Sequence, residues 1–254
     1  FIFESPGSMT FLESEFNLNN AHSFGGAIEI QGSSGSSTIQ ASEFKSNRAD
    51  RGGGAISISD LSRSVRILGS NFSGNEAVYG GGAINGARIG RILVDDCTFE
   101  ENHSGREGGG LSLSDTGPIS IRDTTIIRNK ARSGGGAWIR NGPTLDVTNV
   151  TFVQNKAMNG GGIYLSGMFS VSRMCKFINN TAEFYGGGLC FVSSPTNKRL
   201  SVRNSTFVHN NAALGGVHPD CVVSLISCIF VVSGGAFFQI EPPALSAWFP
   251  TNLV

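Results

Sequence analysis

The chain has 254 residues, of which 35 are glycine, and its 19 basic residues balance its 19 acidic ones. This length suffices for one domain with a substantial core. The balanced charge, with no basic run among aromatic residues, argues against a nucleic-acid partner. No apolar run approaches the roughly 20 residues that span a bilayer, so we expect no transmembrane segment. There are 18 Phe but only three Tyr and two Trp, which indicates that Phe fills one structural position repeatedly.

From Phe16 onward the chain consists of repeats in which an aromatic position is followed, three residues later, by Asn. Such a period is typical of solenoid proteins. The aromatic positions are Phe16, Phe44, Phe72, Phe99, Phe152, Phe177, Phe207 and Phe230, with Ile126 in the fifth copy. The matching amides are Asn19, Asn47, Asn75, Asn102, Asn129, Asn155, Asn180 and Asn210. We expect a stacked Phe ladder and a stacked Asn ladder, with the Asn at a turn that needs left-handed backbone.

A glycine pair follows each of these Asn residues by six and seven positions, except after Asn210. The pair predicts a tight corner with positive φ or a close backbone approach. Two positions later an apolar residue is expected to point inward: Ile28, Ile56, Ile84, Leu111, Trp138, Tyr164 and Leu189.

Alternating apolar residues precede each aromatic position, which predicts strands with one face inward. One repeat cannot bury its own apolar face, whereas stacked coils bury it as a continuous column. The fold class is therefore all-β, a right-handed parallel β-helix of about nine coils of 25–28 residues. We expect one domain over residues 1–240, with a partial first coil over 1–15, and an apolar Pro-containing tail over 241–254.

The segments "FNLNNAHSFGGAIEI", "FKSNRADRGGGAISI" and "FSGNEAVYGGGAING" carry a combined Phe-x-x-Asn and Gly-Gly-Ala-Ile signature. This signature resembles the repeats of the polymorphic outer membrane proteins of chlamydiae, and similar repeats occur in large secreted proteins of algae and other protists. The resemblance covers residues 16–236. It implies a β-helical passenger that is displayed at the cell surface and used in adhesion.

Polysaccharide lyases and hydrolases also use β-helices, and they need clustered acidic residues on an outer face. The best local candidate is Asp95-Asp96, whose side chains should point to opposite faces of a strand. His22, His103, His209 and His218 have no metal-ligand spacing. We therefore expect no catalytic residue, no metal and no cofactor, and we retain a carbohydrate-active or carbohydrate-binding β-helix as the alternative. Against carbohydrate binding, we expect the aromatic residues to lie near the glycine corner or inward: Tyr79, Trp138, Tyr164 and Tyr185.

Cys97, Cys175 and Cys228 share an inward position two residues before the aromatic one, so we expect buried thiols there. Cys221 and Cys228 lie in one coil and could form a disulfide across a corner. The cysteine count therefore leaves the redox compartment open.

Five Asn-x-Ser/Thr sequons begin at Asn71, Asn102, Asn149, Asn179 and Asn204. Asn102 belongs to the ladder and should be buried. We expect N-glycosylation at Asn71, Asn149 and Asn204, and less readily at Asn179, if the chain passes through a eukaryotic secretory pathway.

These expectations combine into an extracellular or cell-surface β-helix with a structural or adhesive role. A stacked β-structure has open ends, so we expect self-association or neighbouring β-helix domains end to end. A host-surface or glycan ligand would suit the long outer faces.

Overall fold

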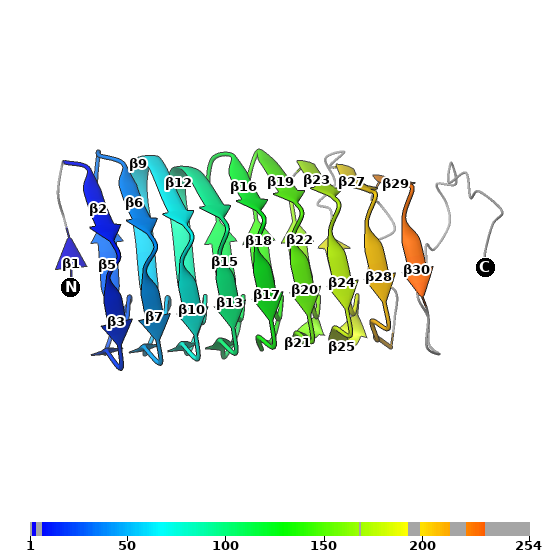
Figure 1. Cartoon of the computed structure of the whole chain (residues 1–254), viewed down its shortest axis with the longest axis horizontal. Helices are drawn as coiled ribbons and strands as arrows, with labels where there is room; N and C mark the ends of the chain where they lie inside the picture. Colours follow the sequence, from blue (N-terminus) through cyan, green and yellow to red (C-terminus); the bar gives the residue numbers. More distant parts are fainter. Residues whose placement is uncertain (1, 4–6, 168, 193–198, 214–221, 232–254) are drawn as a thin grey trace.

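The computed structural model describes residues 2–3, 7–167, 169–192, 199–213 and 222–231. Figure 1 shows these residues as a rod in which the strands of successive turns lie side by side along the long axis. All of the strand pairs are parallel, and each strand pairs with its equivalents in the turns before and after it. The proposed tail over 241–254 lies outside the described residues.

One sheet of 15 strands forms two adjoining faces of the rod. Its first face follows the glycine corner and contains β1 (Ile2–Phe3), β5 (Ile28–Gln31), β15 (Leu111–Ser114), β18 (Ala137–Arg140), β22 (Ile163–Ser166) and β26 (Leu189–Val192). Its second face precedes the aromatic position and contains β2 (Met9–Leu12), β6 (Ser37–Gln40), β16 (Ile119–Arg122), β19 (Thr144–Thr148), β23 (Phe169–Arg173), β27 (Arg199–Arg203) and β29 (Val222–Ile226). Two long strands run through both faces, β9 (Ile56–Leu68) and β12 (Ile84–Asp95).

A second sheet of nine strands carries the aromatic positions. It contains β3 (Glu15–Asn17), β7 (Glu43–Lys45), β10 (Asn71–Ser73), β13 (Thr98–Glu100), β17 (Thr125–Ile127), β20 (Thr151–Val153), β24 (Lys176–Ile178), β28 (Thr206–Val208) and β30 (Ile229–Val231). Short strands close each turn: β4 (Asn20–Ala21), β8 (Arg48–Ala49), β11 (Glu76–Ala77), β14 (His103–Ser104), β21 (Lys156–Asn159) and β25 (Thr181–Tyr185).

The predicted fold class is confirmed as an all-β parallel solenoid, with about seven complete turns between Phe16 and Phe207. The count of about nine copies in the sequence is higher for two reasons. The first copy is partial, and the turn after Phe207 includes residues 214–221, which lie outside the described part.

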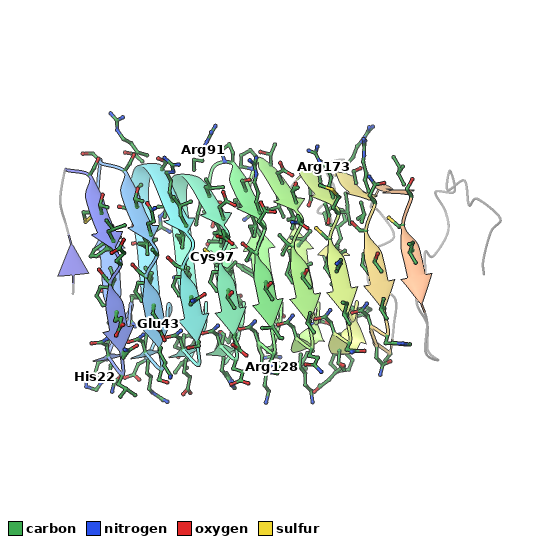
Figure 2. All side chains as sticks on the ribbon, viewed as in Figure 1. His22, Glu43, Arg91, Cys97, Arg128 and Arg173 are labelled. Atoms are coloured by element: carbon green, nitrogen blue, oxygen red, sulfur yellow. The ribbon has the colours of Figure 1, made fainter. Side chains whose placement is uncertain are left out.

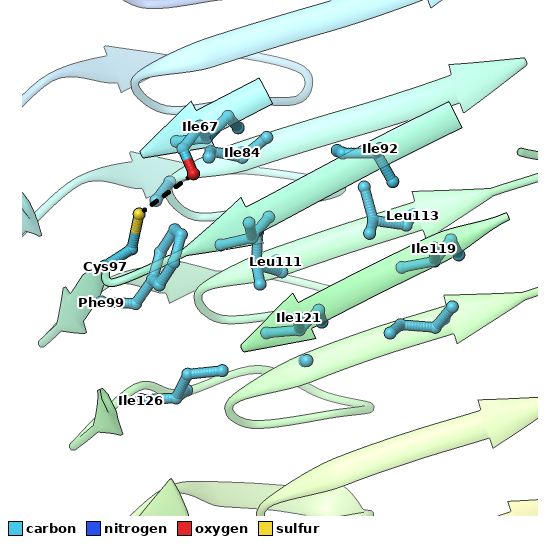
Figure 3. Close-up of a cluster of buried hydrophobic side chains, with 14 of the residues drawn as sticks. Ile67, Ile84, Ile92, Cys97, Phe99, Leu111, Leu113, Ile119, Ile121 and Ile126 are labelled. Carbon is cyan, nitrogen blue, oxygen red and sulfur yellow. Dashed lines mark hydrogen bonds between the residues drawn. The ribbon is translucent and has the colours of Figure 1, made fainter. Parts of the chain in front are cut away.

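The interior is one continuous apolar column of Ile, Leu, Val, Phe and Ala side chains. Figure 3 shows such side chains from neighbouring turns pointing into the same interior, among them Ile92, Leu113 and Ile119. Burying each side chain of this size contributes about 1.5–3 kcal/mol. No single turn could obtain that contribution alone, because its apolar side chains need the adjacent turns to cover them.

Stacked phenylalanine rings form one edge of this core. The rings of Phe16, Phe44, Phe72 and Phe99 are nearly parallel, with centroids 4.8–4.9 Å apart. Ile126 interrupts the stack, and it resumes from Phe152 to Phe207. Phe230 pairs with Phe207 through the backbone, and its side chain lies outside the described part.

The ladder of Asn side chains runs beside the Phe stack from Asn19 to Asn210. Asn75 is typical. Its backbone N–H and its Nδ2 both donate to Oδ1 of Asn102, at 3.0 and 2.9 Å, and Nδ2 also donates to the carbonyl of Phe44 at 3.0 Å. Its own Oδ1 accepts two hydrogen bonds from Asn47. The buried amide thereby makes all four hydrogen bonds that its groups allow.

The left-handed residue of this turn is the one before each ladder Asn, not the Asn itself, so that part of our expectation was wrong. In the first two turns it is Leu18 (φ 58°) and Ser46 (φ 52°). The ladder explains the difference. A side chain that must accept hydrogen bonds from the turn before and donate to the turn after has to point into the rod, and the preceding residue makes the sharp bend.

Hydroxyl groups two residues before the aromatic position also link the turns. Ser42 Oγ donates to the Gln40 carbonyl at 2.8 Å and accepts from the Ser14 N–H at 3.1 Å. In the fourth turn Cys97 takes this position, and its thiol donates to the Asp95 and Ile67 carbonyls at 3.2 and 3.5 Å (Figure 3).

The glycine corner has two distinct requirements. The first glycine of the motif has positive φ, as at Gly81 (φ 61°). The second glycine lies against the next turn, and a Cβ added at Gly82 would collide with the carbonyl oxygen of Gly109. A side chain at the second position would therefore push adjacent turns apart.

We predict that Gly82→Ala destabilises the protein by about 3 kcal/mol or more, because a backbone carbonyl cannot move aside without disturbing the inter-turn hydrogen bonds. The matched control is Gly69→Ala, where an added Cβ meets no atom within 4 Å and the adjacent turn already carries Ala41 at φ 50°. That control should cost about 1 kcal/mol, the strain of a left-handed alanine. Urea denaturation of the two variants measures the difference in their free energies of unfolding. Equal midpoints would contradict the close approach of the next turn to Gly82.

Candidate functional site

Trp138 and Tyr164 point out of the rod, which corrects our expectation that they fill the inward column. Ala137 is the register partner of Leu111 and Ile163. Trp138 is instead aligned with Ser112 on one side and Tyr164 on the other. Since side chains alternate along a strand, both rings belong to the outer face.

The physical reason is a deletion of one residue before the strand. In the fourth turn six positions separate the ladder Asn102 from the left-handed Gly108, whereas five separate Asn129 from Gly134. The sixth turn repeats this shorter spacing, since Gly160 is its left-handed glycine. Runs of three glycines conceal the deletion in the sequence. The signal that could have revealed it is the alternation of β18, where Ile139 must be inward and its neighbours outward.

The outward rings are part of what we call the aromatic strip: Tyr79, Trp138, Tyr164, Phe184 and Tyr185. It contains all three tyrosines of the chain, and Trp248 lies outside the described residues. Tyr79, Phe184 and Tyr185 are 45–48% exposed, Tyr164 is half-buried, and Trp138 is only 7% exposed. Most described Phe side chains fill the interior, whereas the three tyrosines, Trp138 and the exposed Phe184 take outward positions.

The corner backbone leans over the outward side chains of the first face. A Cβ added at Gly80, just before the corner, would lie 3.0 Å from Asn85 Oδ1 and 3.4 Å from Ser112 Oγ. In later turns Glu107, Ser133 and Asn159 follow Gly80 in the same bridge column. Side chains from the corner and from the strand therefore converge on the strip.

Charged groups on the strip act on one another. Burial raises the pKa of Glu107 above its ordinary value, and the positive charges of Arg140 and Arg106 oppose this shift. Burial likewise raises the pKa of Tyr164, with Cys190, Arg140 and Glu107 as further influences. The guanidinium of Arg106 lies 4.9 Å from the centroid of the Tyr79 ring, a cation–π arrangement.

Elsewhere on the rod, some arginines pair with acids of neighbouring turns. Arg88 binds Asp60 at 2.5 and 2.9 Å and holds the pKa of that carboxyl below its usual range. Arg128 pairs with both Glu100 and Glu101, at the edge of the rod opposite Arg91 and Arg173 (Figure 2).

Other arginines have no such partner among the described residues, including Arg66 and Arg91 and the three that lie beside the aromatic strip. Within the described part of the chain, Arg106, Arg132 and Arg140 have no carboxylate within 4.0 Å, and all three are exposed. Asn159 adds a buried side-chain oxygen that has no hydrogen-bond partner among the described residues. The strip therefore combines half-exposed rings with guanidinium groups that have no ion-pair partner among the described residues.

The five sequon asparagines fall into two groups, one buried residue and four exposed ones. Asn102 is fully buried and hydrogen-bonded in the ladder. The other four sequon residues are exposed: Asn71 on β10, and Asn149, Asn179 and Asn204 at left-handed corners. Asn149 donates to Asp123 Oδ1 at 2.6 Å.

Asp95 and Asp96 do not point to opposite faces, which corrects our expectation. The strand ends at Asp95, and Asp96 is a left-handed corner residue with φ 53°, so neither side chain enters the core. Among the residues that the structure describes, no three His, Cys, Asp or Glu side chains gather as metal ligands. His22 pairs with Asp50 at 3.1 Å, and His218 lies outside the described part.

The thiols of Cys97 and Cys175 are buried in the inward position, and burial raises the pKa of Cys97 to about 11. Cys228 is a half-buried free thiol at the same position. Cys221, its proposed disulfide partner, lies outside the described residues.

Comparison with protein families gives one match, to the family described as "Right handed beta helix region", over residues 7–182. Comparison with curated proteins found no match, and comparison with solved structures found none either. Within the described residues there is no helix long and apolar enough to cross a bilayer.

We predict that Glu107→Gln raises the melting temperature at pH 7.5 but not below pH 4. A carboxyl whose pKa is raised on folding is protonated in both the folded and the unfolded state well below its ordinary pKa of 4.5. At such pH its ionisation therefore makes no contribution to the free energy of unfolding. As the pH rises through the folded-state pKa, the ionised group opposes folding. Thermal melts at the two pH values measure the effect, and Glu183→Gln, which removes an exposed carboxyl, controls for the loss of one charge. A larger effect at low pH would contradict the prediction.

Proposed function

Because the chain belongs to the right-handed β-helix family, we propose that it is a non-enzymatic structural or adhesive scaffold at the cell surface or outside the cell. The observation that carries this proposal is the division between interior and surface. The interior is occupied by ladders of equivalent residues that hydrogen-bond or stack on one another in successive turns, as Asn75 hydrogen-bonds to Asn102 and Phe72 stacks on Phe99. The inward pattern repeats with few exceptions, such as Ile126 and Cys97, whereas the outward residues differ from turn to turn, which suits a rod that presents binding residues along its length.

The repeat signature supports surface display in particular. Phe-x-x-Asn and Gly-Gly-Ala-Ile have clear structural duties here, in the ladder and at the glycine corner. They resemble the repeats of the chlamydial polymorphic outer membrane proteins, in which such a rod is used in adhesion. We extend that role to this chain as a proposal.

Self-association belongs to the same proposal. Among the described residues, β2 pairs only with β6 and β3 only with β7. A further β-helical turn, from another domain or another copy, would continue the same backbone hydrogen bonds.

A carbohydrate-active enzyme is the second candidate, and Glu107 is the observation that favours it, because a raised carboxyl pKa suits a general acid. Glycoside hydrolysis employs two carboxyl groups about 5–10 Å apart. The charged groups that shift the pKa of Glu107 are instead Arg140 and Arg106, an arrangement that suits binding better than hydrolysis. We therefore rank this function second.

We predict that beads coated with the folded chain adhere to cells or extracellular matrix several-fold more than albumin-coated beads. Beads coated with the heat-unfolded chain are the matched control, since they carry the same residues without the ordered face. Assays for new reducing ends on polysaccharides such as polygalacturonate and dextran test the second candidate, a carbohydrate-active enzyme. Adhesion no better than albumin would overturn the adhesive role, and release of reducing ends would favour the enzyme.

Glycosylation provides a separate test of export. Expressed through a eukaryotic secretory pathway, the chain should carry glycans at Asn71, Asn149 and Asn204, and less at Asn179, because these amides are exposed. Asn102 should remain unmodified, because its amide is buried in the ladder. Glycopeptide mass spectrometry measures the occupancy, and a glycan at Asn102 would contradict the burial argument.

A further inference from the structure

We propose that the aromatic strip, together with Arg106, Arg132 and Arg140, is a binding site for an acidic polysaccharide, whose chain lies along the rod axis. This inference rests on the proposed adhesive function and specifies its ligand. The ligand chemistry is a run of sugar rings that bear carboxylate or sulfate groups.

The sugar rings would be recognised by the half-exposed aromatic side chains. Tyr79, Phe184 and Tyr185 present 45–48% of their surface, and Tyr and Trp offer a flat apolar face together with a polar atom. Tyr164 lies between them along the axis, half-buried. Trp138, its register partner, is too buried to stack on a sugar and serves as the support beneath the strip.

The strip has the length and direction of an extended chain. Tyr79 lies in the turn after Phe72 and Tyr185 in the turn after Phe177, four turns further along. With 4.8 Å between adjacent turns, as between the Phe72 and Phe99 rings, the strip is about 19 Å long. A ligand along the axis would meet an accessible aromatic ring in three of these five turns, Arg106 and Glu107 in the second turn, and Arg132 in the third, where Trp138 is buried.

The charge of the ligand follows from the arginines. Arg106, Arg132 and Arg140 have no carboxylate within 4.0 Å among the described residues, and the guanidinium of Arg106 lies 4.9 Å from the centroid of the Tyr79 ring. A guanidinium matches carboxylate or sulfate oxygens with paired hydrogen bonds. Even when Glu183, which precedes Phe184, is counted with Glu107, the three arginines outnumber the carboxyl groups of the strip.

Polar atoms of the strip can serve the sugar hydroxyls. Glu107, Ser133 and Asn159 occupy one column and are half-buried, so their side chains can hydrogen-bond sugar hydroxyls at the surface.

The test measures binding of the folded chain to polygalacturonate and dextran sulfate, with methyl-esterified polygalacturonate and dextran as uncharged probes. The chain has a formal net charge of +0, so general attraction to polyanions should be small. We expect both acidic probes, or one of them, to bind, and the uncharged probes to bind at least about 10-fold more weakly. Binding of polygalacturonate alone identifies carboxylate as the recognised group. Binding of dextran sulfate alone identifies sulfate.

The variant pair is Arg106→Ala/Arg140→Ala against Arg66→Ala/Arg91→Ala, which removes the same charge from exposed arginines of β9 and β12 that are not part of the strip. We expect the first pair to weaken binding about 10-fold or more and the second to change it less than about 2-fold. Tyr185→Ala, at an exposed ring, should also weaken binding without affecting folding. Equal losses in both pairs, or no binding of either acidic probe, would overturn the site. If adhesion of coated beads persisted in that case, the scaffold function would stand and only this ligand assignment would fail.

Discussion

Hydrogen bonding between equivalent residues of successive turns is the constraint on which the rest of this molecule depends. Each turn is stable only because its amide, hydroxyl and backbone groups meet the same groups one turn away. The Asn ladder shows this most clearly, since Asn75 uses every donor and acceptor of its side chain on residues of adjacent turns. A displaced turn would leave buried polar groups unpaired on both sides, which is costly.

This constraint explains which positions tolerate variation. Inward positions must stack, so they hold Phe, Ile, Asn and small hydroxyl residues. The second glycine of the corner must stay bare, because the next turn lies where its Cβ would be. Outward positions carry no such requirement. They hold ion pairs such as Arg88–Asp60 on one face and unpaired arginines with aromatic rings on another.

The aromatic strip arises where the repeat is least regular. Loss of one residue between Asn129 and Gly134 leaves the Asn ladder intact and shifts only which residue begins the strand. That shift turns Trp138 outward, and the same change turns Tyr164 outward in the next turn. A small change of spacing that the stacked core tolerates has thus placed two large rings at the surface, beside Glu107 and Arg140.

The sequence by itself determined the repeat, the strands, the inward ladders and the parallel β-helix, because a recurring period forces equivalent residues to stack. It also indicated that Asn102 would be buried and Asn71 exposed, since both follow from their offsets to Phe. Only the tertiary structure decided which residue makes the left-handed bend and which way Trp138 and Tyr164 point. The physical reason is that a one-residue slip reverses the facing of a whole strand, and three consecutive glycines carry no side chain that would reveal the slip. The gathering of Tyr79, Glu107 and Arg140 beside these rings likewise depends on how the corner backbone leans over the strand, which the repeat alone does not specify.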